Sequence, residues 1–246
     1  MFQHLDLLAV FLLGILAGTL GGVIGFGSSI VLMPVLVILF GPREAVPIMA
    51  VAALLANASR ALVWWREVDW RAFAAYSATG VPAAALGAST LLTIPQRGIE
   101  VAMGVFFLAV IPARRWLAGH DLRINLWQLA LAGALVGYIT GIVVSTGPIN
   151  APFFLALGLV KGAYLATEAL GSLAVYISKT IVFRSFGALP PDIFYKGLVI
   201  GSSLMVGSFV AKRLVLRLEA EQFSLLIEGL LLVSALTMLG AAVLAH

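Results

Sequence analysis

Two long apolar stretches of this chain are interrupted by small and polar residues at matching places. The first contains GGVIGFGSS from Gly21 and resumes as IVLMPVLVILFG, while the second contains GIVVSTGPIN from Gly141 and resumes as APFFLALGL. Inside a bilayer, a broken helix is tolerated only where protein buries the freed backbone groups or where they line a cavity. Paired interruptions in two halves of a chain indicate the binding site of a membrane transporter.

The composition is that of a membrane protein. Of the 246 residues, 62% are hydrophobic and 11% are charged, whereas roughly 25% of a soluble domain is charged. The mean hydropathy is +1.10, and we therefore predict an all-α polytopic membrane protein. The absence of cysteine excludes disulfides and thiolate-ligated metals, and the three histidines are too scattered in the sequence for a metal site. We expect no cofactor, no metal and no nucleic-acid partner.

Ten apolar segments follow one another along the chain. They cover roughly residues 5–20, 28–41, 44–63, 72–93, 97–116, 125–144, 148–160, 164–183, 192–213 and 221–245. The segments that follow the interruptions reach only about 20 Å at 1.5 Å per residue, less than the roughly 30 Å of a hydrocarbon core. Either they re-enter their own side, which gives eight crossings, or they cross with the interruptions inside the membrane, which gives ten.

Positive charge favours ten crossings. Without Lys179, which lies inside an apolar segment, ten crossings place ten lysines and arginines on one face and four on the other; eight crossings place eight against six. The positive-inside rule favours the uneven division, with the Arg-rich linkers in the cytoplasm and both termini outside. The tryptophans flank the two most basic linkers, as an interfacial belt requires; they are Trp64, Trp65, Trp70, Trp116 and Trp127.

The two halves of the chain align at an offset near 119 residues. The matched pairs are Gly18 with Gly137, Gly22 with Gly141, Pro34 with Pro152, Arg60 with Lys179 and Gly87 with Gly207. We interpret residues 1–119 and 120–246 as two repeats of about five transmembrane segments, each with a broken helix. Five crossings per half make the repeats inverted, which suits alternating access; four per half would make them parallel. Chance similarity between hydrophobic helices is the alternative to duplication.

The same residues carry a family resemblance. The run GTLGGVIGFGSSIVLMPVL, followed after a basic central loop by GYITGIVVSTGPINAPFFL, resembles the TauE/SafE sulfite exporter family, also called the 4-toluene sulfonate uptake permeases. The resemblance covers essentially the whole chain. It implies a multi-pass transporter of the bacterial inner membrane for sulfite, organosulfonates or other small anions. The second interruption carries Ser145, Thr146 and Asn150 where the family pattern has glycine, so the resemblance does not fix the substrate.

The two interruptions supply a candidate anion site. Glycine lets the backbone leave the helical region, and a helix that restarts at Ser28 or Ser29 offers backbone N–H groups and a positive dipole end. Pro148 suits the first turn of the helix after the second interruption. The predicted substrate-binding residues here are Gly22, Gly25, Gly27, Ser28, Ser29, Ser145, Thr146, Gly147 and Asn150. Close helix packing is the alternative role of these glycines. It is the role we expect for Gly14, Gly18, Gly80, Gly87, Gly133, Gly137, Gly201 and Gly207.

Charged residues within the apolar segments complete the set. Arg60 and Lys179 occupy equivalent repeat positions, and we expect each to attract an anion from one membrane face, although both side chains are long enough to snorkel to the headgroups. Asn57, one turn before Arg60, is predicted to line the same path or to cap a helix. Glu168 is the candidate for ion coupling, because a desolvated carboxylate can carry a proton; stabilisation of its own helix terminus is the alternative.

These features predict a secondary transporter of small anions, most simply organosulfonates or sulfite, that works by alternating access. An anion channel is the alternative, and an intramembrane enzyme is a weaker one. The sequence contains no HExxH motif, no paired intramembrane aspartates and no Walker motif, so we predict that the chain is not an enzyme. The expected partners are the lipid bilayer, the anion and, in a homodimer, a second copy of the chain.

Overall fold

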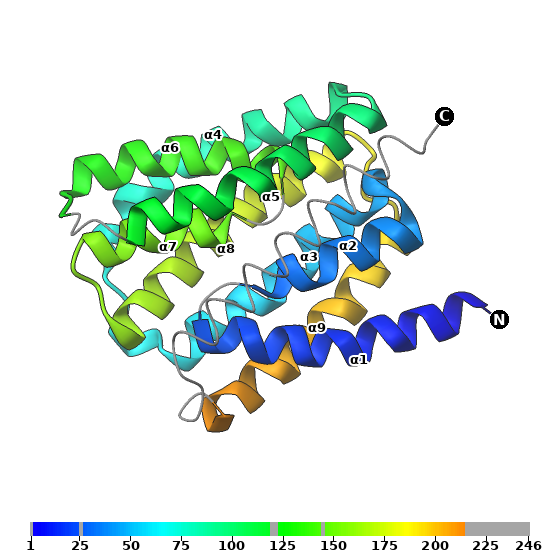
Figure 1. Cartoon of the computed structure of the whole chain (residues 1–246), viewed down its shortest axis with the longest axis horizontal. Helices are drawn as coiled ribbons and strands as arrows, with labels where there is room; N and C mark the ends of the chain where they lie inside the picture. The colour runs from blue at the N-terminus through cyan, green and yellow to red at the C-terminus, as the bar shows by residue number, and fades with distance from the viewer. Residues whose placement is uncertain (1, 25–26, 119–122, 144–145, 215–246) are drawn as a thin grey trace.

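The computed structural model describes residues 2–24, 27–118, 123–143 and 146–214. Across these residues the chain is helical and contains no strand (Figure 1). The elements are α1 (Phe2–Ile24), α2 (Ser28–Phe40), α3 (Pro42–Val63), the 3-10 turn η1 (Trp65–Glu67), α4 (Trp70–Thr93), α5 (Gln96–Ala118), α6 (Leu126–Ile142), α7 (Gly147–Ala156), α8 (Lys161–Ser185) and α9 (Pro191–Leu214). The predicted all-α fold is confirmed. The tenth predicted segment, 221–245, lies outside the described residues.

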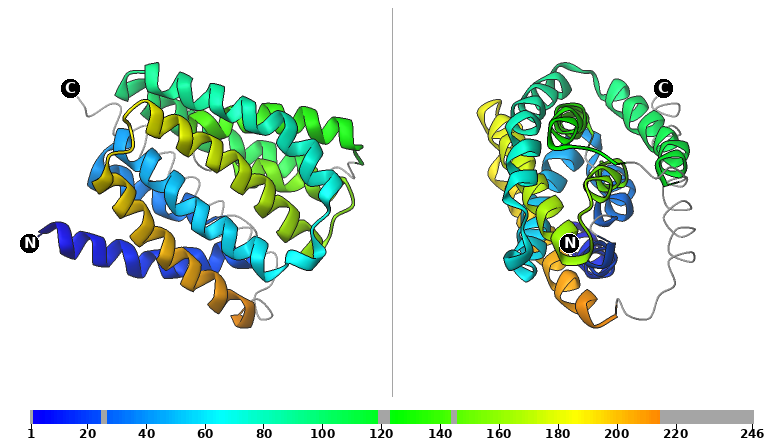
Figure 2. Two further views of the ribbon diagram at one scale, coloured as in Figure 1. Left: turned by 180° about the vertical axis from the view of Figure 1, so that it is seen from behind. Right: turned by 90° about the vertical axis from the view of Figure 1, so that its left-hand side faces the viewer.

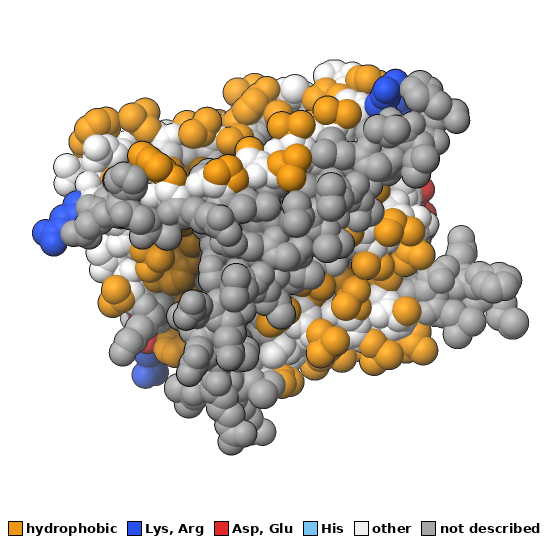
Figure 3. Space-filling view, viewed as in Figure 1, with side chains coloured by type: hydrophobic (Ala, Val, Ile, Leu, Met, Phe, Trp, Pro, Cys, Tyr) orange, Lys and Arg blue, Asp and Glu red, His pale blue; other side chains and the backbone are white. Residues whose placement is uncertain are grey.

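The outer surface of the bundle is apolar. Figure 3 shows hydrophobic side chains spread over one face, with lysines and arginines near its margins, and large apolar side chains such as Leu16, Leu86 and Trp127 are more than half exposed. Three helices are long and apolar enough to cross a membrane by length and composition: Arg43–Val63, Gly162–Ser185 and Pro191–Ala211. Shorter apolar helices are Leu8–Gly22, Ser28–Phe40 and Leu126–Ile142. Together these features are those of a polytopic membrane protein.

Successive helices alternate in direction along the bundle. Figures 1 and 2 place η1 and the linker 157–160 at one end, and the linkers at Gly41, 94–95 and 186–190 at the other. The eight-crossing interpretation required the linkers at 41–44 and 161–163 to share a face. Because they lie at opposite ends, the described helices do not follow the eight-crossing interpretation, and the positions of their linkers agree with the ten-crossing one.

Helices pack in pairs that relate the two halves of the chain. Helix α1 packs along α9, and α4 packs along α6. Between these pairs, α3 and α8 contact each other; α3 also contacts α9, and α8 also contacts α4. When each helix is exchanged for its repeat equivalent, α1 for α6, α3 for α8 and α4 for α9, the same pairs return. This pairing is the one that a duplicated chain predicts.

Glycines allow the two paired seams to form. A Cβ atom on Gly137 of α6 would lie 2.4 Å from the carbonyl oxygen of Gly80 in α4, and one on Gly207 of α9 would lie 2.2 Å from that of Ile15 in α1. No side chain fits at such separations, so the backbones approach each other through small residues, as they do in many membrane proteins. The predicted packing role of these glycines is confirmed.

Candidate functional site

Both predicted interruptions are real breaks between helices. Helix α1 ends at Ile24 and α2 begins at Ser28, with Gly27 between them in a left-handed conformation at φ 113°. That conformation is open to glycine and strained for other residues. Helix α6 ends at Ile142, and α7 begins at Gly147.

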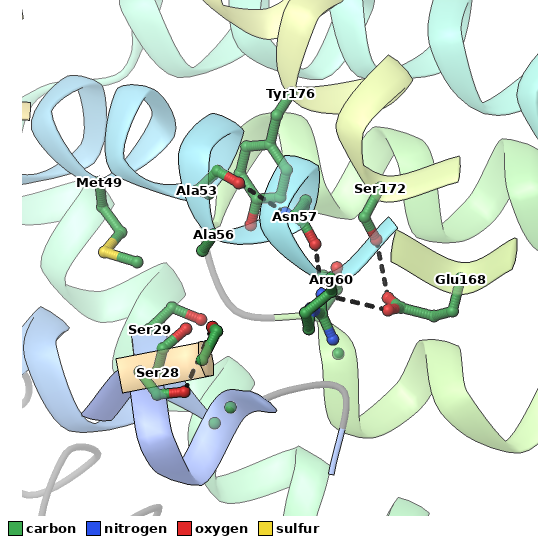
Figure 4. A pocket seen from close by; sticks show the side chains of 16 residues that line it. Ser28, Ser29, Met49, Ala53, Ala56, Asn57, Arg60, Glu168, Ser172 and Tyr176 are labelled. Atoms are coloured by element: carbon green, nitrogen blue, oxygen red, sulfur yellow. Dashed lines mark hydrogen bonds and ion pairs between the residues drawn. The ribbon is translucent and has the colours of Figure 1, made fainter. Parts of the chain in front are cut away.

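The two breaks open onto one cavity, shown in Figure 4. The cavity has a volume of about 40 Å³; since one water needs roughly 10–15 Å³ on the same measure, a few waters or one small ion fit. It is lined by Gly18, Gly21, Gly27, Ser28, Ser29, Met49, Ala53, Ala56, Asn57, Arg60, Thr146, Gly147, Glu168, Ser172, Tyr176 and Ser208. The N-terminal ends of α2 and α7 therefore reach the same space, and both bring a positive dipole end to it.

A buried ion pair crosses one wall of this cavity. Arg60 Nη2 of α3 lies 3.3 Å from Glu168 Oε2 of α8, and the two side chains are 11% and 3% exposed. The same Nη2 donates a hydrogen bond to Asn57 Oδ1, while Asn57 Nδ2 donates to the carbonyl oxygen of Ala53 at 2.8 Å. Arg60 thus points inward and does not snorkel to the headgroups. Its guanidinium is held on one side by Asn57 and on the other by Glu168 (Figure 4).

The other carboxylate oxygen of Glu168 receives two neutral donors. Asn150 Nδ2 of α7 donates to Oε1 at 3.0 Å, and Ser172 Oγ donates to it at 2.7 Å. The dipole of a helix acts mainly within its first turn, and Glu168 lies beyond the first turn of α8. Its carboxylate therefore interacts with side chains of α3 and α7 and not with the end of its own helix. The carboxylate therefore joins three helices at the wall of the cavity.

One donor of the arginine is not used within the protein. Among the described residues, no hydrogen-bond partner is found for Arg60 Nη1, which is buried. The contact of Glu168 Oε2 with Arg60 is ionic and lacks hydrogen-bond geometry. Because an unsatisfied buried charged donor is costly, a guanidinium in this state suits an acceptor that arrives from the cavity.

Lys179 lies away from the cavity, at the C-terminal end of α6. Its side chain is fully buried, and Nζ donates to the carbonyl oxygens of Thr140 at 2.7 Å and Val143 at 3.4 Å. It also lies 5.3 Å from the centre of the Phe183 ring. The side chain therefore does not snorkel, and it stabilises the negative end of the broken helix.

A hydroxyl pair links this end of α6 to the cavity. Thr140 Oγ1 and Thr146 Oγ1 lie 2.5 Å apart across the second break, and Thr146 lines the cavity. Lys179 is therefore connected to the cavity only indirectly: it bonds to the backbone of Thr140, whose hydroxyl bonds to Thr146. Arg60 faces the cavity directly. The repeat alignment had placed the two cations in equivalent roles, and the structure gives them different contacts.

The predicted site residues fall into three groups. The structure brings eight of them to the cavity wall: Gly27, Ser28, Ser29, Asn57, Arg60, Thr146, Gly147 and Glu168. Three lie elsewhere: Asn150 donates a hydrogen bond to Glu168, Lys179 donates to a carbonyl oxygen at the end of α6, and Gly22 packs against Ser208 and Ala211 of α9. The remaining two, Gly25 and Ser145, are outside the described residues.

Sequence reasoning did not find Ser172 and Tyr176 as cavity residues. They follow Glu168 by four and eight positions, so the three side chains share one face of α8. The i, i+4 spacing from an intramembrane carboxylate was the available signal. Small apolar residues of the wall, such as Ala53 and Ala56, could not be identified as cavity residues from the sequence.

A second cavity opens at the end of the bundle that holds the linkers at Gly41 and 186–190. Its volume is about 410 Å³, and it is lined by Arg43, Glu44, Val46, Pro47, Leu91, Leu92, Ile94, Ile99, Phe183, Gly187, Ala188, Pro190 and Ile193. Along α3 the lining passes from Pro47 in this cavity to Met49 in the smaller one, and along α8 from Phe183 to Tyr176. Along α8, the fully buried Lys179 lies between these two linings.

Comparison with known proteins identifies the family. No curated protein and no solved structure matches the chain. A family model described as Sulfite exporter TauE/SafE matches residues 10–238, which is nearly the whole chain. This match confirms the resemblance seen in the two interrupted segments. The chain belongs to the sulfite exporter TauE/SafE family, a family of integral membrane transporters and not of enzymes.

Proposed function

We propose that this chain carries small oxyanions, namely sulfite or organosulfonates, across the bacterial inner membrane as a secondary transporter that works by alternating access. The observation that carries the proposal is the convergence of three features on one cavity: the N-terminal end of α2, the N-terminal end of α7 and the buried guanidinium of Arg60. Each of these favours negative charge.

The chemistry of the wall suits a sulfonate or sulfite head group. Its three oxygens are acceptors only, and a planar guanidinium with an unused Nη1 donor matches such a group better than a lysine ammonium does. Ser28 and Thr146 add neutral hydroxyls, whose hydrogen bonds are weak enough to allow release. The cavity has room for only a few waters, which suits the head group alone, so an organic tail would project out of this cavity.

The arrangement of the cavities supports alternating access. The larger cavity lies at one end of the bundle, and it shares no lining residue with the smaller one at the two breaks. Two separate cavities in place of one continuous pore favour a carrier over an open channel. We infer that residues 1–119 and 120–246 are inverted repeats whose relative movement opens the site to each face in turn. The packing of α1 against α9 and of α6 against α4, which are equivalent pairs in the two halves, supports this inference.

Flux measurements on purified protein in liposomes test the proposal. We expect uptake of sulfite and ethanesulfonate that saturates with concentration, together with counterflow exchange when unlabelled anion is loaded inside. Arg60→Gln should abolish this uptake, and Arg66→Gln is the matched control, because Arg66 lies exposed in η1. Flux that never saturates and shows no counterflow would identify a channel, and no flux of any sulfur oxyanion would overturn the substrate class. The predicted homodimer stays a prediction, which the mass of the detergent-solubilised protein tests.

A further inference from the structure

The cavity contains one charge of each sign. Of the residues that line it, Arg60 is the cation and Glu168 is the acid, and they form an ion pair. With both groups ionised, the charge of Arg60 is already balanced before any substrate arrives. An oxyanion that binds to Arg60 therefore competes with the carboxylate of Glu168 for the same guanidinium.

An anion in the cavity makes the ionised carboxylate unfavourable. It brings a second negative charge beside Glu168 in a site where both carboxylate and guanidinium are almost fully buried, and like charges at short range favour the neutral, protonated form of a carboxyl group. Arginine stays charged under all ordinary conditions. The group that can relieve the conflict is therefore Glu168, by accepting a proton.

The other groups around Glu168 do not take this role. Tyr76 of α4 and Tyr164 and Tyr176 of α8 lie within electrostatic range of its carboxylate, but tyrosine is neutral at physiological pH. Helix α7 contributes Asn150, which does not titrate. Glu67 of η1 approaches α8 at Gly162 instead. Lys179, further along the same helix, is engaged with the carbonyls of α6.

The hydrogen bonds of Glu168 suit both protonation states. Asn150 and Ser172 donate to Oε1, and a protonated carboxyl group keeps this oxygen as an acceptor. The proton would be carried by Oε2, the oxygen that faces Arg60 and has no hydrogen bond in the described structure. There it can donate to the bound oxyanion once the ion pair with Arg60 has opened.

We propose that Glu168 is the proton site of this transporter and that one proton binds with each anion, in exchange for the Arg60–Glu168 ion pair. This proposal rests on the proposed anion transport. A proton taken from water balances the charge of one monovalent sulfonate, so the loaded site has the same net charge as the empty one. Transport of such an anion is then electroneutral, driven by a pH gradient and insensitive to membrane voltage.

Ethanesulfonate is the probe for the test, because as a strong acid it carries no proton of its own at neutral pH. Liposomes that contain the full-length protein and an internal pH dye are given external ethanesulfonate, with the voltage clamped by potassium and valinomycin. We expect acidification of the lumen by one proton per anion, the same rate at every clamped voltage, and accumulation driven by an acidic exterior. The Kd for ethanesulfonate should rise by up to about tenfold for each unit of rising pH.

Two variants separate this role from a structural one. Glu168→Gln imitates the protonated residue, so counterflow exchange should persist while pH-driven accumulation and the pH dependence of Kd are lost. Glu67→Gln, an exposed acid at the same end of the bundle, should behave as the unaltered protein. If Glu168→Gln does not fold, proton uptake by the unaltered protein, measured by calorimetry in buffers of different ionisation enthalpy, decides the question.

The outcomes distinguish the two proposals. Ethanesulfonate uptake that follows voltage and moves no proton would overturn the role of Glu168 and leave anion transport standing. Retention of pH-driven accumulation by a folded Glu168→Gln variant would do the same. Failure of the unaltered protein to move ethanesulfonate in any assay, counterflow included, would overturn the proposed substrate class itself.

Discussion

Lys179 Nζ lies 2.7 Å from the carbonyl oxygen of Thr140, at the place where α6 ends and the second break begins. The last carbonyls of any helix lack partners within that helix, and in the interior of a membrane protein they find no bulk water. An ammonium group with three donors can satisfy more than one of them. The buried lysine thus explains how α6 can stop inside the bundle.

We predict that Lys179→Met lowers the stability of the protein. The substitution keeps a long apolar stem but leaves the carbonyls of Thr140 and Val143 without their donor, at a cost of about 1–3 kcal/mol. Thermal unfolding in detergent measures the effect. The control is Lys196→Met, because Lys196 pairs with the partly exposed Glu44, and such pairs contribute about 0–1 kcal/mol. A melting temperature that rises in Lys179→Met would show that burial of the cation costs more than its hydrogen bonds gain.

A double-mutant cycle should show that Arg60 and Glu168 depend on each other. Arg60→Gln leaves a buried carboxylate without its cation, and we expect a loss of about 3–5 kcal/mol. The double variant with Glu168→Gln should recover most of that stability, because neither charge is then buried alone. Affinity for ethanesulfonate should stay reduced roughly 10- to 100-fold whenever Arg60 is absent, as read from the ligand-induced shift in melting temperature. Additive losses in the cycle would contradict a direct interaction.

The sequence predicts the local features of this fold better than its long-range contacts. Gly27 and Pro148 act on their own backbone, so the breaks between helices could be located from residue types. The apolar lengths likewise gave the helices to within a few residues. The charge count of the linkers predicted an alternating course, which the positions of η1 and the linker 186–190 follow (Figure 2).

The site itself required the tertiary structure. Arg60 and Glu168 belong to different halves of the chain, and no local pattern states that α3 packs against α8. The alignment of Arg60 with Lys179 predicted similar roles, but equivalent positions have different neighbours: the guanidinium meets a carboxylate, and the ammonium meets carbonyls. The paired interruptions therefore predicted which segments converge, and the alignment of the two halves did not predict the chemistry of each contact.

We expect the glycine seams to tolerate no added methyl group. Gly137→Ala would place a carbon 2.4 Å from the carbonyl oxygen of Gly80, and Gly207→Ala would place one 2.2 Å from that of Ile15. Each pair of helices must then separate, at a cost of about 1–3 kcal/mol. Ala78→Val adds more carbon on the exposed face of α4 and should leave the melting temperature within a degree or two of the original. Equal effects of the three substitutions would show that the seams are not close-packed.

The absence of cysteine allows a clean test of topology. Glu67→Cys lies in η1 and Asp192→Cys at the start of α9, both at exposed positions, and these elements are at opposite ends of the bundle (Figures 1 and 2). Because the Arg-rich linkers are predicted to be cytoplasmic, a membrane-impermeant maleimide should label Asp192→Cys in intact cells. Glu67→Cys should be labelled only after the membrane is permeabilised. Labelling of both from the same side would overturn the ten-crossing arrangement.

Finally, the hydroxyl of Ser172 should set the pH range of transport. It donates to Glu168 Oε1 at 2.7 Å, and a hydrogen bond to an ionised group contributes about 1.5–3 kcal/mol. A hydrogen bond to the charged carboxylate is stronger than one to the neutral acid, so Ser172→Ala removes support mainly from the charged form. If protonation of Glu168 accompanies anion binding, the pH at which ethanesulfonate uptake falls to half should rise by about one unit, the difference between a charged and a neutral hydrogen bond. Ser202→Ala is the control, because the exposed Ser202 hydroxyl donates only to the carbonyl oxygen of Val199 in its own helix; it should leave the profile unchanged. A half-maximal pH that falls, or that does not move in a folded Ser172→Ala variant, would show that the carboxylate does not control uptake.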